Sequence, residues 1–543
     1  MQGKKRYQEK LFTHFQLSDH VPQDNFYRRL KEVLDLNYLY PQTTSYYGFC
    51  GQKSIDPVVF MKLMLVGYLE NIISDRQLIQ HCSMRLDILY FIGYDIDEPL
   101  PWHSTLSRTR HLLPEDIFTR CFEEVLQLCV DQGMVRGKTQ SIDSAPIKAN
   151  ASMDSLELKV PAIELEEHLR KVRYYSLKDR EEKDESDNAQ SINHRKAKQD
   201  HSTKTQRTID SDSRTLQSIK TRNKKWKEEQ TERPGAKNPQ SKYTSNKTHY
   251  SPVDPDSRIS VKPGKARKLN YMSQMAVDSQ EHVITHISAH HADKGDNQCL
   301  EEIVESLQWR LQRYGLPMKN LLADTGYSSG ENYAYLEQKG ITSYIPPHGT
   351  FKGGPEGFKF VEEGNYWLCK NNKRVTFRKD TKEKSRTSYG KGYNRKKLYL
   401  TKPSDCKACP LKLQCIGKAP EKRITITYFV KEYQRAIERV QSSKGQYFKR
   451  KRSSTVEPVF GVLTQFMGLR KINTRGIEQA NKVMLLSAMA YNLKKYLKRL
   501  SKPIKNKAQA LGKTMRAHIN LKKHQTRLII NLYATLKSNV ELL

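Results

Sequence analysis

The chain has 543 residues, which is too long for one typical domain, so we expect three or four folded units. Its 94 Lys and Arg outnumber 59 Asp and Glu, giving a formal net charge of +35. This excess predicts binding to a polyanion, with nucleic acid favoured over a ribosome-associated role. A membrane partner is disfavoured because there is no long apolar segment, amphipathic anchor or signal peptide pattern, so we expect an intracellular protein.

Residues 1–135 are predicted to form an all-helical N-terminal domain. Asp56 followed by Pro57, and Ser74 before another apolar repeat, are typical helix starts. Short helices joined by tight turns, with Arg108 and Arg110 in one of them, favour a helix-turn-helix-like DNA-binding domain. The alternative is a helical packing domain whose arginines are only solvated.

The rest of the chain alternates between structured and polar stretches. Residues 136–154 and 269–347 are typical of an α/β core, with a β-hairpin first and parallel strands later. Residues 155–268 between them are polar and charged, and the part from Asn188 to Lys247 is not expected to bury a core by itself. This stretch forms either a charged phosphate-binding arm or a solvated linker. A β-rich insertion is predicted at 348–430, the last helical part of the core at 431–500, and a basic helical tail at 501–543.

Three acidic residues lie in settings typical of a metal-dependent site. Asp143 and Asp324 each end a short apolar strand candidate, and Glu457 is expected at a helix start because Pro458 suits a first turn. Ligand sites gather at the carboxyl ends of strands in α/β sheets, so these carboxylates are expected to converge. Carboxylates are the ligands that Mg²⁺ prefers, and two such ions catalyse phosphodiester chemistry. Individually, each acid is also explained as a turn former or a helix cap.

The sequence segments around these three acids resemble those of a known family. Ile142-Asp-Ser-Ala-Pro-Ile-Lys-Ala-Asn, Leu322-Ala-Asp-Thr-Gly-Tyr-Ser-Ser and Val456-Glu-Pro-Val-Phe-Gly resemble segments of the DDE transposases of bacterial insertion sequences. The helical start is similar to the N-terminal domain of one large group of them. The resemblance covers about residues 20–500. It implies a ribonuclease H-like core with Asp143 on the first strand, Asp324 on the fourth and Glu457 on a late helix, interrupted by the polar arm and the β-rich insertion.

The resemblance also implies an activity. Two Mg²⁺ (or Mn²⁺) ions on Asp143, Asp324 and Glu457 would support cleavage of transposon ends and joining of the 3′-hydroxyls to target DNA. The partners would be the terminal inverted repeats and target DNA, bound by a homodimer in the bacterial cytoplasm at the nucleoid. The alternatives are a non-catalytic DNA-binding protein descended from a transposase and a ribonuclease H-like nuclease without strand transfer.

Basic residues are expected to hold the DNA. Related transposases often carry Lys or Arg seven residues after the glutamate, whereas Thr464 stands there in this chain. Other basic residues can supply the missing charge. The predicted DNA-binding set is Arg108, Arg110, Lys148, Arg452, Arg470, Lys471 and Arg475.

The β-rich insertion carries a possible zinc site. Cys406 and Cys409 form a CxxC pair, and Cys415 follows six residues later, which is a typical thiolate–metal spacing. Cys369 is a plausible fourth ligand of a structural Zn²⁺, and unmetallated thiols are the alternative. The remaining cysteines are expected to be ordinary thiols.

Two further motifs have a functional and a structural interpretation. His286, His290, His291 and Asp293 form either a metal site or a polar turn. Trp367 either stacks on a displaced base or belongs to a strand core.

Overall fold

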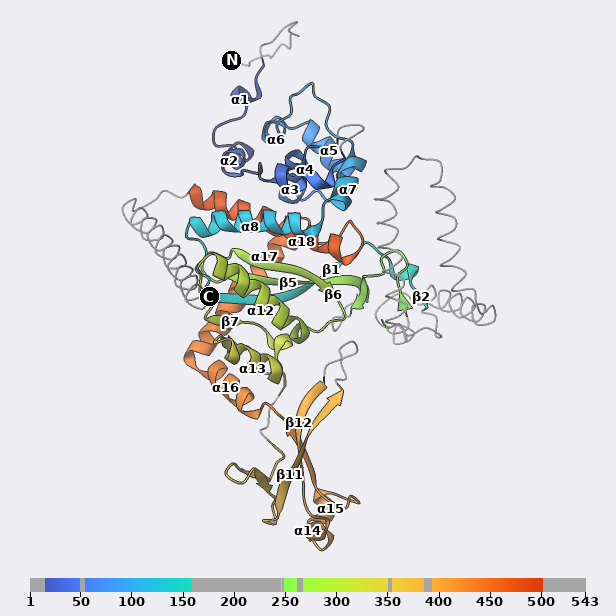
Figure 1. The fold of residues 1–543 in the computed structure, drawn as a ribbon, viewed down its shortest axis with the longest axis vertical. Coiled ribbons are helices and arrows are strands. Elements are labelled where there is room, and N and C mark those ends of the chain that lie inside the picture. The colour runs from blue at the N-terminus through green and yellow to red at the C-terminus, as the bar shows by residue number, and fades with distance from the viewer. Residues whose placement is uncertain are drawn as a thin grey trace, which may run out of the picture. The chain divides into compact units, whose positions relative to one another are not determined.

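The computed structural model describes residues 15–48, 54–158, 246, 249–260, 267–349, 354–384 and 393–501. It is a mixed α/β structure with a helical N-terminal region and β-rich parts further along the chain (Figure 1). Two compact units are present, Met1–Leu493 and Lys494–Leu543, and helix α18 (Ile477–Leu500) crosses their boundary. In the described part of the chain, no helix has the length and apolarity needed to cross a membrane.

The N-terminal region is helical, as the sequence predicts. Its helices are α1 (Leu17–His20), α2 (Phe26–Val33), α3 (Leu39–Thr43), α4 (Pro57–Leu69), α5 (Asp75–Ser83), α6 (Leu86–Ile92), α7 (His103–Leu112) and α8 (Glu115–Asp131). Helix α4 starts where expected, because the Asp56 carboxylate accepts the Val58 and Val59 backbone N–H groups at 2.7 and 3.0 Å. Almost every side chain of α4 is buried, so the other helices pack around it.

The prediction that Arg110 binds DNA is wrong, because its side chain is buried. Its side chain is buried beneath the N-terminal helices, with Nη2 2.6 Å from Asp75 Oδ1 and 3.2 Å from Met64 Sδ. A guanidinium paired inside the fold holds helices together and does not reach a phosphate. Arg108, two residues earlier on α7, is exposed and stays available for DNA.

A six-stranded sheet forms the centre of the α/β part. Its strands are β1 (Thr139–Lys148), β4 (Arg258–Ser260), β5 (Lys268–Asp278), β6 (Ile284–His291), β7 (Asn320–Leu322) and β8 (Thr342–Tyr344). Strand β1 pairs antiparallel with β5 on one side and parallel with β7 on the other, and β7 pairs parallel with β8. The far edge of β5 pairs with both β4 and β6. The sequence predicts this hairpin followed by parallel strands.

Helices cover this sheet and close one edge. Helix α12 (Asp296–Arg313) packs on β5 and β6, α13 (Gly330–Gln338) on β8, and α16 (Val430–Gln441) on α13. Outward-facing backbone groups of β6 are bonded by side chains of α18: Asn492 bonds both Ile284 N–H and C=O, and Asn481 accepts Ala289 N–H. These amides satisfy polar groups that an edge strand would otherwise leave unpaired.

Helix α17 (Ser443–Phe466) contacts β1, β5, β7 and β8 and carries Glu457 in its interior. The predicted helix start at Glu457 is therefore wrong. Pro458 costs about 3 kcal/mol within a helix because it lacks a donor and crowds the preceding turn. Val456, Val459, Phe460 and Leu463 are buried on the same helix, and each such side chain contributes about 1.5–3 kcal/mol. Tertiary burial therefore carries the helix through the proline.

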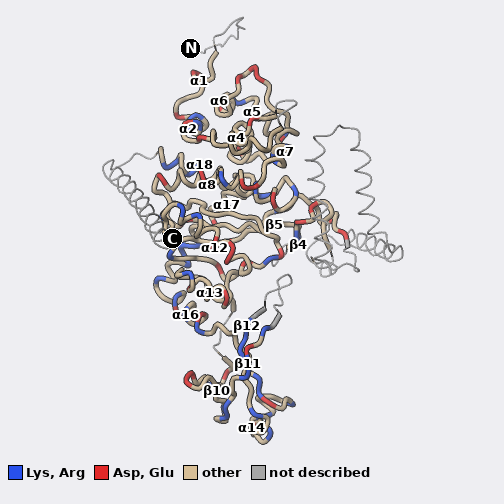
Figure 2. Tube along the Cα trace, viewed as in Figure 1, with Lys and Arg blue, Asp and Glu red and all other residues tan. Residues whose placement is uncertain are grey.

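The predicted insertion is a separate five-stranded antiparallel sheet. Its strands are β9 (Lys359–Val361), β10 (Tyr366–Leu368), β11 (Arg374–Lys384), β12 (Tyr393–Leu400) and β13 (Arg423–Thr427), with short helices α14 (Pro403–Lys407) and α15 (Lys412–Cys415) before β13. Lys and Arg recur along β11 and β12 (Figure 2). Most of the predicted polar arm lies outside the described residues. Near its two ends, β2 (Glu157–Leu158) pairs with β3 (His249–Tyr250).

Replacing Arg110 should test its structural role. Arg110→Ala would leave Asp75 as a largely buried carboxylate without its partner, and we expect a loss of about 3 kcal/mol of unfolding free energy. Arg108→Ala, on the same helix but exposed, should change that free energy by less than about 0.5 kcal/mol. Denaturant unfolding of the two variants measures the difference. Equal unfolding midpoints would contradict the structural assignment.

Candidate active site

The register of the central sheet places two predicted acids side by side. The last parallel pair of β1 and β7 is Ser141 with Leu322, and Asp143 and Asp324 each stand two residues further along. Asp143 does not end its strand as predicted, because β1 continues to pair with β5 as far as Lys148. What ends near Asp143 is the pairing with β7, which opens one side of β1 at that point. The two acids therefore follow the last paired residues of two neighbouring parallel strands, at the point where these strands separate.

Asp143 is enclosed and surrounded by charges of both signs. Its side chain is only 17% exposed, Ser144 N–H donates to Oδ1 at 2.9 Å, and Arg452 Nη1 donates to Oδ2 at 3.0 Å. Burial raises the pKa of Asp143 above its usual value, and the charge of Asp324 raises it further, while Arg452 opposes both. The site thus holds like charges close together and needs a cation to balance them.

Arg452 provides such a cation between two of the predicted acids. It lies on α17 five residues before Glu457, and its Nη2 is 3.4 Å from Glu457 Oε1 while Nη1 bonds Asp143. Glu457 is 59% exposed, so its carboxylate faces the open side of the site. Among the described residues, no three His, Cys, Asp or Glu side chains converge tightly enough, as placed, to hold an ion. The guanidinium therefore lies between the Asp143 and Glu457 carboxylates and offsets part of their negative charge.

A fourth acid, Asp296, lies beside the site and was not predicted. A Cβ atom on Gly326 would be 2.8 Å from Asp296 Oδ2 and 3.0 Å from Asp324 Oδ1, so a larger residue here would require these carboxylates to shift. Gln274 of β5 donates to Asp296 Oδ1 at 2.8 Å and accepts from the buried Tyr327 hydroxyl. The pKa of Tyr327 is raised well above its usual value by burial, with added contributions from the nearby carboxylates.

The turn after β7 fixes the position of Asp324. Its Oδ1 accepts the Gly326 N–H at 2.9 Å, which caps the 3₁₀ turn η4 (Thr325–Tyr327). Asp296, Gln274 and Tyr327 were not predicted as site residues. Of these three, only Asp296 had a signal in the sequence, because it is an acid in the first turn of a helix. That pattern is equally typical of an ordinary helix start.

The predicted basic residues separate into groups. The Lys148 C=O accepts a hydrogen bond from Ile472 N–H at 2.8 Å, and the backbones of Lys148 and Lys471 form an isolated parallel β-bridge. The end of β1 therefore adjoins the loop after α17. Lys148, Arg470 and Arg475 are exposed there. We call Lys148, Arg470, Lys471 and Arg475 the basic junction. The Thr464 hydroxyl donates to Phe460 C=O of its own helix at 2.7 Å, so it is not directed at the acidic site.

Two other predictions are settled by packing. Trp367 is 4% exposed in a small core with Val375, Tyr399 and Ile424, which confirms the core interpretation and removes it from base stacking. The histidines lie within strand β6 and not in a turn: Ser288 Oγ bonds His286 at 3.1 Å and His290 at 3.0 Å. Burial lowers the pKa of both histidines, so they act as neutral bonded side chains.

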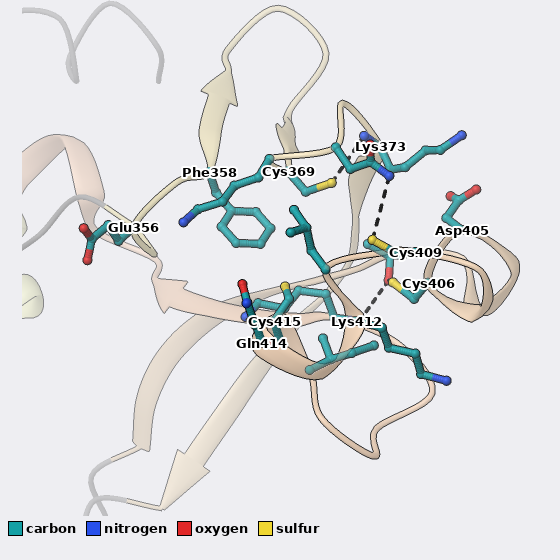
Figure 3. Close-up of a pocket in the computed structure, with 16 residues that line it drawn as sticks. Glu356, Phe358, Cys369, Lys373, Asp405, Cys406, Cys409, Lys412, Gln414 and Cys415 are labelled. Atoms are coloured by element: carbon teal, nitrogen blue, oxygen red, sulfur yellow. Dashed lines mark hydrogen bonds between the residues drawn. The ribbon is translucent and has the colours of Figure 1, made fainter.

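The cysteines divide as expected into two classes. Cys82, Cys121, Cys129 and Cys299 are buried in helices and pack as small apolar residues. Cys50 lies outside the described residues. The four predicted zinc ligands, in contrast, line one cavity of the insertion: Cys369, Cys406, Cys409 and Cys415 (Figure 3).

Comparison with known proteins gives two family matches. Residues 15–112 match a family described as a transposase domain (DUF772), and residues 368–497 match a transposase DDE domain. The second match contains Arg452 and Glu457, whereas Asp143 and Asp324 lie between the two matched regions. No curated protein matches the chain.

Replacing Arg452 with an uncharged residue should change the pKa of Asp143. Arg452→Gln takes away the charge that opposes the raised pKa of Asp143, so that pKa should rise further. A divalent ion binds the deprotonated carboxylate, so Mn²⁺ affinity should fall as pH is lowered through this pKa. The fall should come at a higher pH in Arg452→Gln than in the unmodified chain. Arg470→Gln is the matched control, because Arg470 is exposed at the basic junction.

Calorimetric titration of Mn²⁺ between about pH 4 and pH 8 measures this shift. At the upper end of that range Arg452→Gln should bind Mn²⁺ at least as tightly as the unmodified chain, since the guanidinium no longer competes. An identical pH profile for Arg452→Gln and Arg470→Gln would contradict the coupling.

Proposed function

Both family matches support a DDE transposase of an insertion sequence, and from that premise we propose that the chain cleaves transposon ends and joins them to target DNA. The observation that carries the proposal is the register of β1 and β7, which sets Asp143 beside Asp324, with Arg452 between Asp143 and Glu457. The three acids are assigned as the catalytic set.

The sheet order supports a ribonuclease H-like core. Strand β1 is central, with the β5–β6 hairpin on one side and the parallel strands β7 and β8 on the other. Counting β1, β5, β6 and β7, Asp143 then lies on the first strand of the core, Asp324 after the fourth, and Glu457 on a late helix. We infer that residues 136–154, 269–347 and 431–500 form this core, around a polar arm and a β-rich insertion. The short strand β4, within the predicted polar arm, pairs with β5 in the same sheet, so this end of the arm adds to the core.

The donor set fits Mg²⁺ or Mn²⁺. The acids are hard oxygen ligands, and burial of Asp143 beside Asp324 creates an excess of negative charge that a small cation relieves. The bridging Arg452 supports this fit, because a positive group already occupies the site. When bound, two divalent ions would supply Lewis-acid stabilisation to both the attacking and the leaving oxygen. Asp143, Asp324 and Glu457 would hold them.

The residues of the chain then have distinct tasks in two successive displacements. Water attacks the phosphodiester at each transposon end and releases a 3′-hydroxyl, and that hydroxyl attacks a target phosphodiester at the same site. Each displacement exchanges one P–O bond for another, so no covalent protein intermediate is required. The carboxylates must be deprotonated throughout, and the hydrogen bond from Ser144 N–H helps to hold Asp143 in that state.

Arg452 and the basic junction are assigned to the DNA backbone. With cations held by the acids, the Arg452 guanidinium would be free to bind a phosphate next to the scissile bond. Lys148 ends the same strand, β1, beside Lys471, and the exposed charges of Lys148, Arg470 and Arg475 suit backbone phosphates. Arg452 would in this way replace the basic residue that is absent at Thr464.

The DNA partner and assembly follow from the same proposal. Terminal inverted repeats and target DNA are the substrates, with Arg108 among the contacts of the N-terminal domain, and two ends cut together call for a homodimer on DNA. We place this activity in the bacterial cytoplasm at the nucleoid.

The two alternative functions make different demands on the site. A DNA-binding descendant without activity needs no carboxylate cluster, and the adjacency of Asp143 and Asp324 argues against it. A nuclease without strand transfer would use the same acids, so pre-cleaved ends incubated with target DNA distinguish it from a transposase.

Asp324→Asn should abolish cleavage of terminal-repeat DNA in Mg²⁺, because an amide cannot replace a carboxylate ligand. We expect a loss of more than about 100-fold, given that even outer-sphere partners of a metal are worth 10–100-fold. Glu331→Gln is the matched control, as an exposed acid seven residues along the chain, and it should retain full cleavage. Both variants should bind the repeat DNA with unchanged affinity.

Cleavage is measured on labelled repeat DNA, and binding by mobility shift. Undiminished cleavage by Asp324→Asn would overturn the catalytic assignment. Loss of DNA binding together with cleavage would instead indicate a structural role for Asp324.

A further inference from the structure

The β-rich insertion contains a segment that holds its shape without a core of its own. Between Thr401 and Lys422, the chain forms helices α14 and α15, and neither helix buries a single residue. Every residue from 402 to 421 is exposed or only partly buried. Helices of four and five residues are far too short to be stable alone in water. Some interaction other than apolar burial must therefore order this segment.

We propose that one structural Zn²⁺ ties this segment to the insertion sheet through four cysteines, namely Cys369, Cys406, Cys409 and Cys415. All four line one cavity of about 190 Å³ (Figure 3). Three come from the segment around α14 and α15, and Cys369 follows strand β10 of the sheet. An ion held by all four would thus close a loop between two parts of the insertion that share little apolar contact.

Polar donors reach three of the four sulfur atoms. Lys373 N–H donates to Cys369 Sγ at 3.3 Å, and Thr401 Oγ1 lies 3.1 Å from Cys406 Sγ. Asn371 Nδ2 is 3.8 Å from Cys409 Sγ. Hydrogen bonds to sulfur stabilise thiolate ligands and orient them around a metal.

The charges around the cavity match a zinc–thiolate centre. Four thiolates on one Zn²⁺ carry an excess of two negative charges. The cavity is lined by two acids, Glu356 and Asp405, and by four lysines, which leaves an excess of two positive charges. The lysines are Lys370, Lys373, Lys412 and Lys422. Lys422 also donates to Cys415 C=O at 3.1 Å, which keeps its ammonium group at the edge of the site.

The sulfur atoms do not meet at one point as placed. No three metal-binding side chains converge within the residues described, and the thiols surround the cavity at its walls. Binding therefore requires side-chain rotation toward the middle of the cavity. Cys415 is exposed and Cys369, Cys406 and Cys409 are partly exposed, so none is locked by core packing.

The sheet beneath the cavity explains why a metal would be needed. Its buried cluster consists of Trp367, Val375, Tyr399 and Ile424 only, with Phe358, Cys369 and Ile426 packed against it. Cys369 packs against this cluster from its edge and also lines the cavity, so an ion on its sulfur would connect the segment to the core. The site is structural in this proposal and independent of the catalytic acids.

The test uses the full-length chain, purified under reducing conditions and analysed for metal by mass spectrometry. We expect about one zinc per chain, and about none in Cys406→Ser/Cys409→Ser. Cys299→Ala, which alters a buried cysteine outside the insertion, is the matched control and should keep its zinc. Co²⁺ reconstitution of the unmodified chain should give the intense visible absorption of a tetrahedral thiolate site, which does not depend on variant folding. Protease cleavage between Lys402 and Lys422 should accelerate when zinc is removed.

Three outcomes would count against the proposal. Absence of zinc from the unmodified chain, with no uptake of Zn²⁺ or Co²⁺ on reconstitution, would overturn it. Full zinc content in Cys406→Ser/Cys409→Ser would also overturn it. Zinc retained in Cys369→Ser but lost in Cys415→Ser would overturn the role of Cys369 and leave a three-cysteine site.

Discussion

The parallel pairing of β1 with β7 is the constraint on which the site depends. Three paired residues fix the register, and that register carries Asp143 and Asp324 to the same place, two residues beyond the last pair. Like charges brought together in a half-buried position are unfavourable, and burial with Asp324 nearby raises the pKa of Asp143 as a result. Arg452 offsets part of this cost through its hydrogen bond to Asp143. The Asp324 carboxylate has a local structural role, because it caps the turn after β7, and the proposed catalytic role would explain why Asp143 stands next to it.

Arg452 links this constraint to the rest of the molecule. Helix α17 packs across β1 and delivers both Arg452 and Glu457, so the guanidinium bridges a strand acid and a helix acid. The same bridge offsets part of the negative charge of Asp143 and Glu457. In the proposed reaction, Arg452 would exchange this internal partner for a DNA phosphate. A basic residue before Glu457 would then supply the charge that was expected from one after it.

Much of this arrangement could be predicted from the sequence, and the failures have physical causes. Asp324 was placed correctly because an apolar strand ends just before it and Thr-Gly follows. Asp143 was misplaced at a strand end because its pairing with β5 depends on residues more than a hundred positions away. Glu457 was misplaced because Pro458 signals a helix start locally, whereas four buried side chains keep the helix continuous.

The solvent exposure of individual side chains does not follow from the sequence alone. Arg108 and Arg110 look alike in sequence, yet one is exposed and the other is paired with Asp75 inside the helical region. Asp296 escaped notice because an acid in a first helical turn has an ordinary explanation, and only the contacts around Gly326 reveal its neighbour. The CxxC spacing, in contrast, depends on local sequence alone, and the cysteines it selects line one cavity.

The central claim is that Asp143, Asp324 and Glu457 share divalent ions. Anomalous diffraction from crystals of the full chain grown with Mn²⁺ tests it most directly, because Mn²⁺ is located without reference to activity. The account predicts anomalous peaks coordinated by Asp143 and Asp324, with Glu457 in the same cluster and the Arg452 guanidinium moved away from Asp143. Mn²⁺ bound elsewhere, or a site in which Arg452 still bridges Asp143 and Glu457 at saturating Mn²⁺, would contradict it.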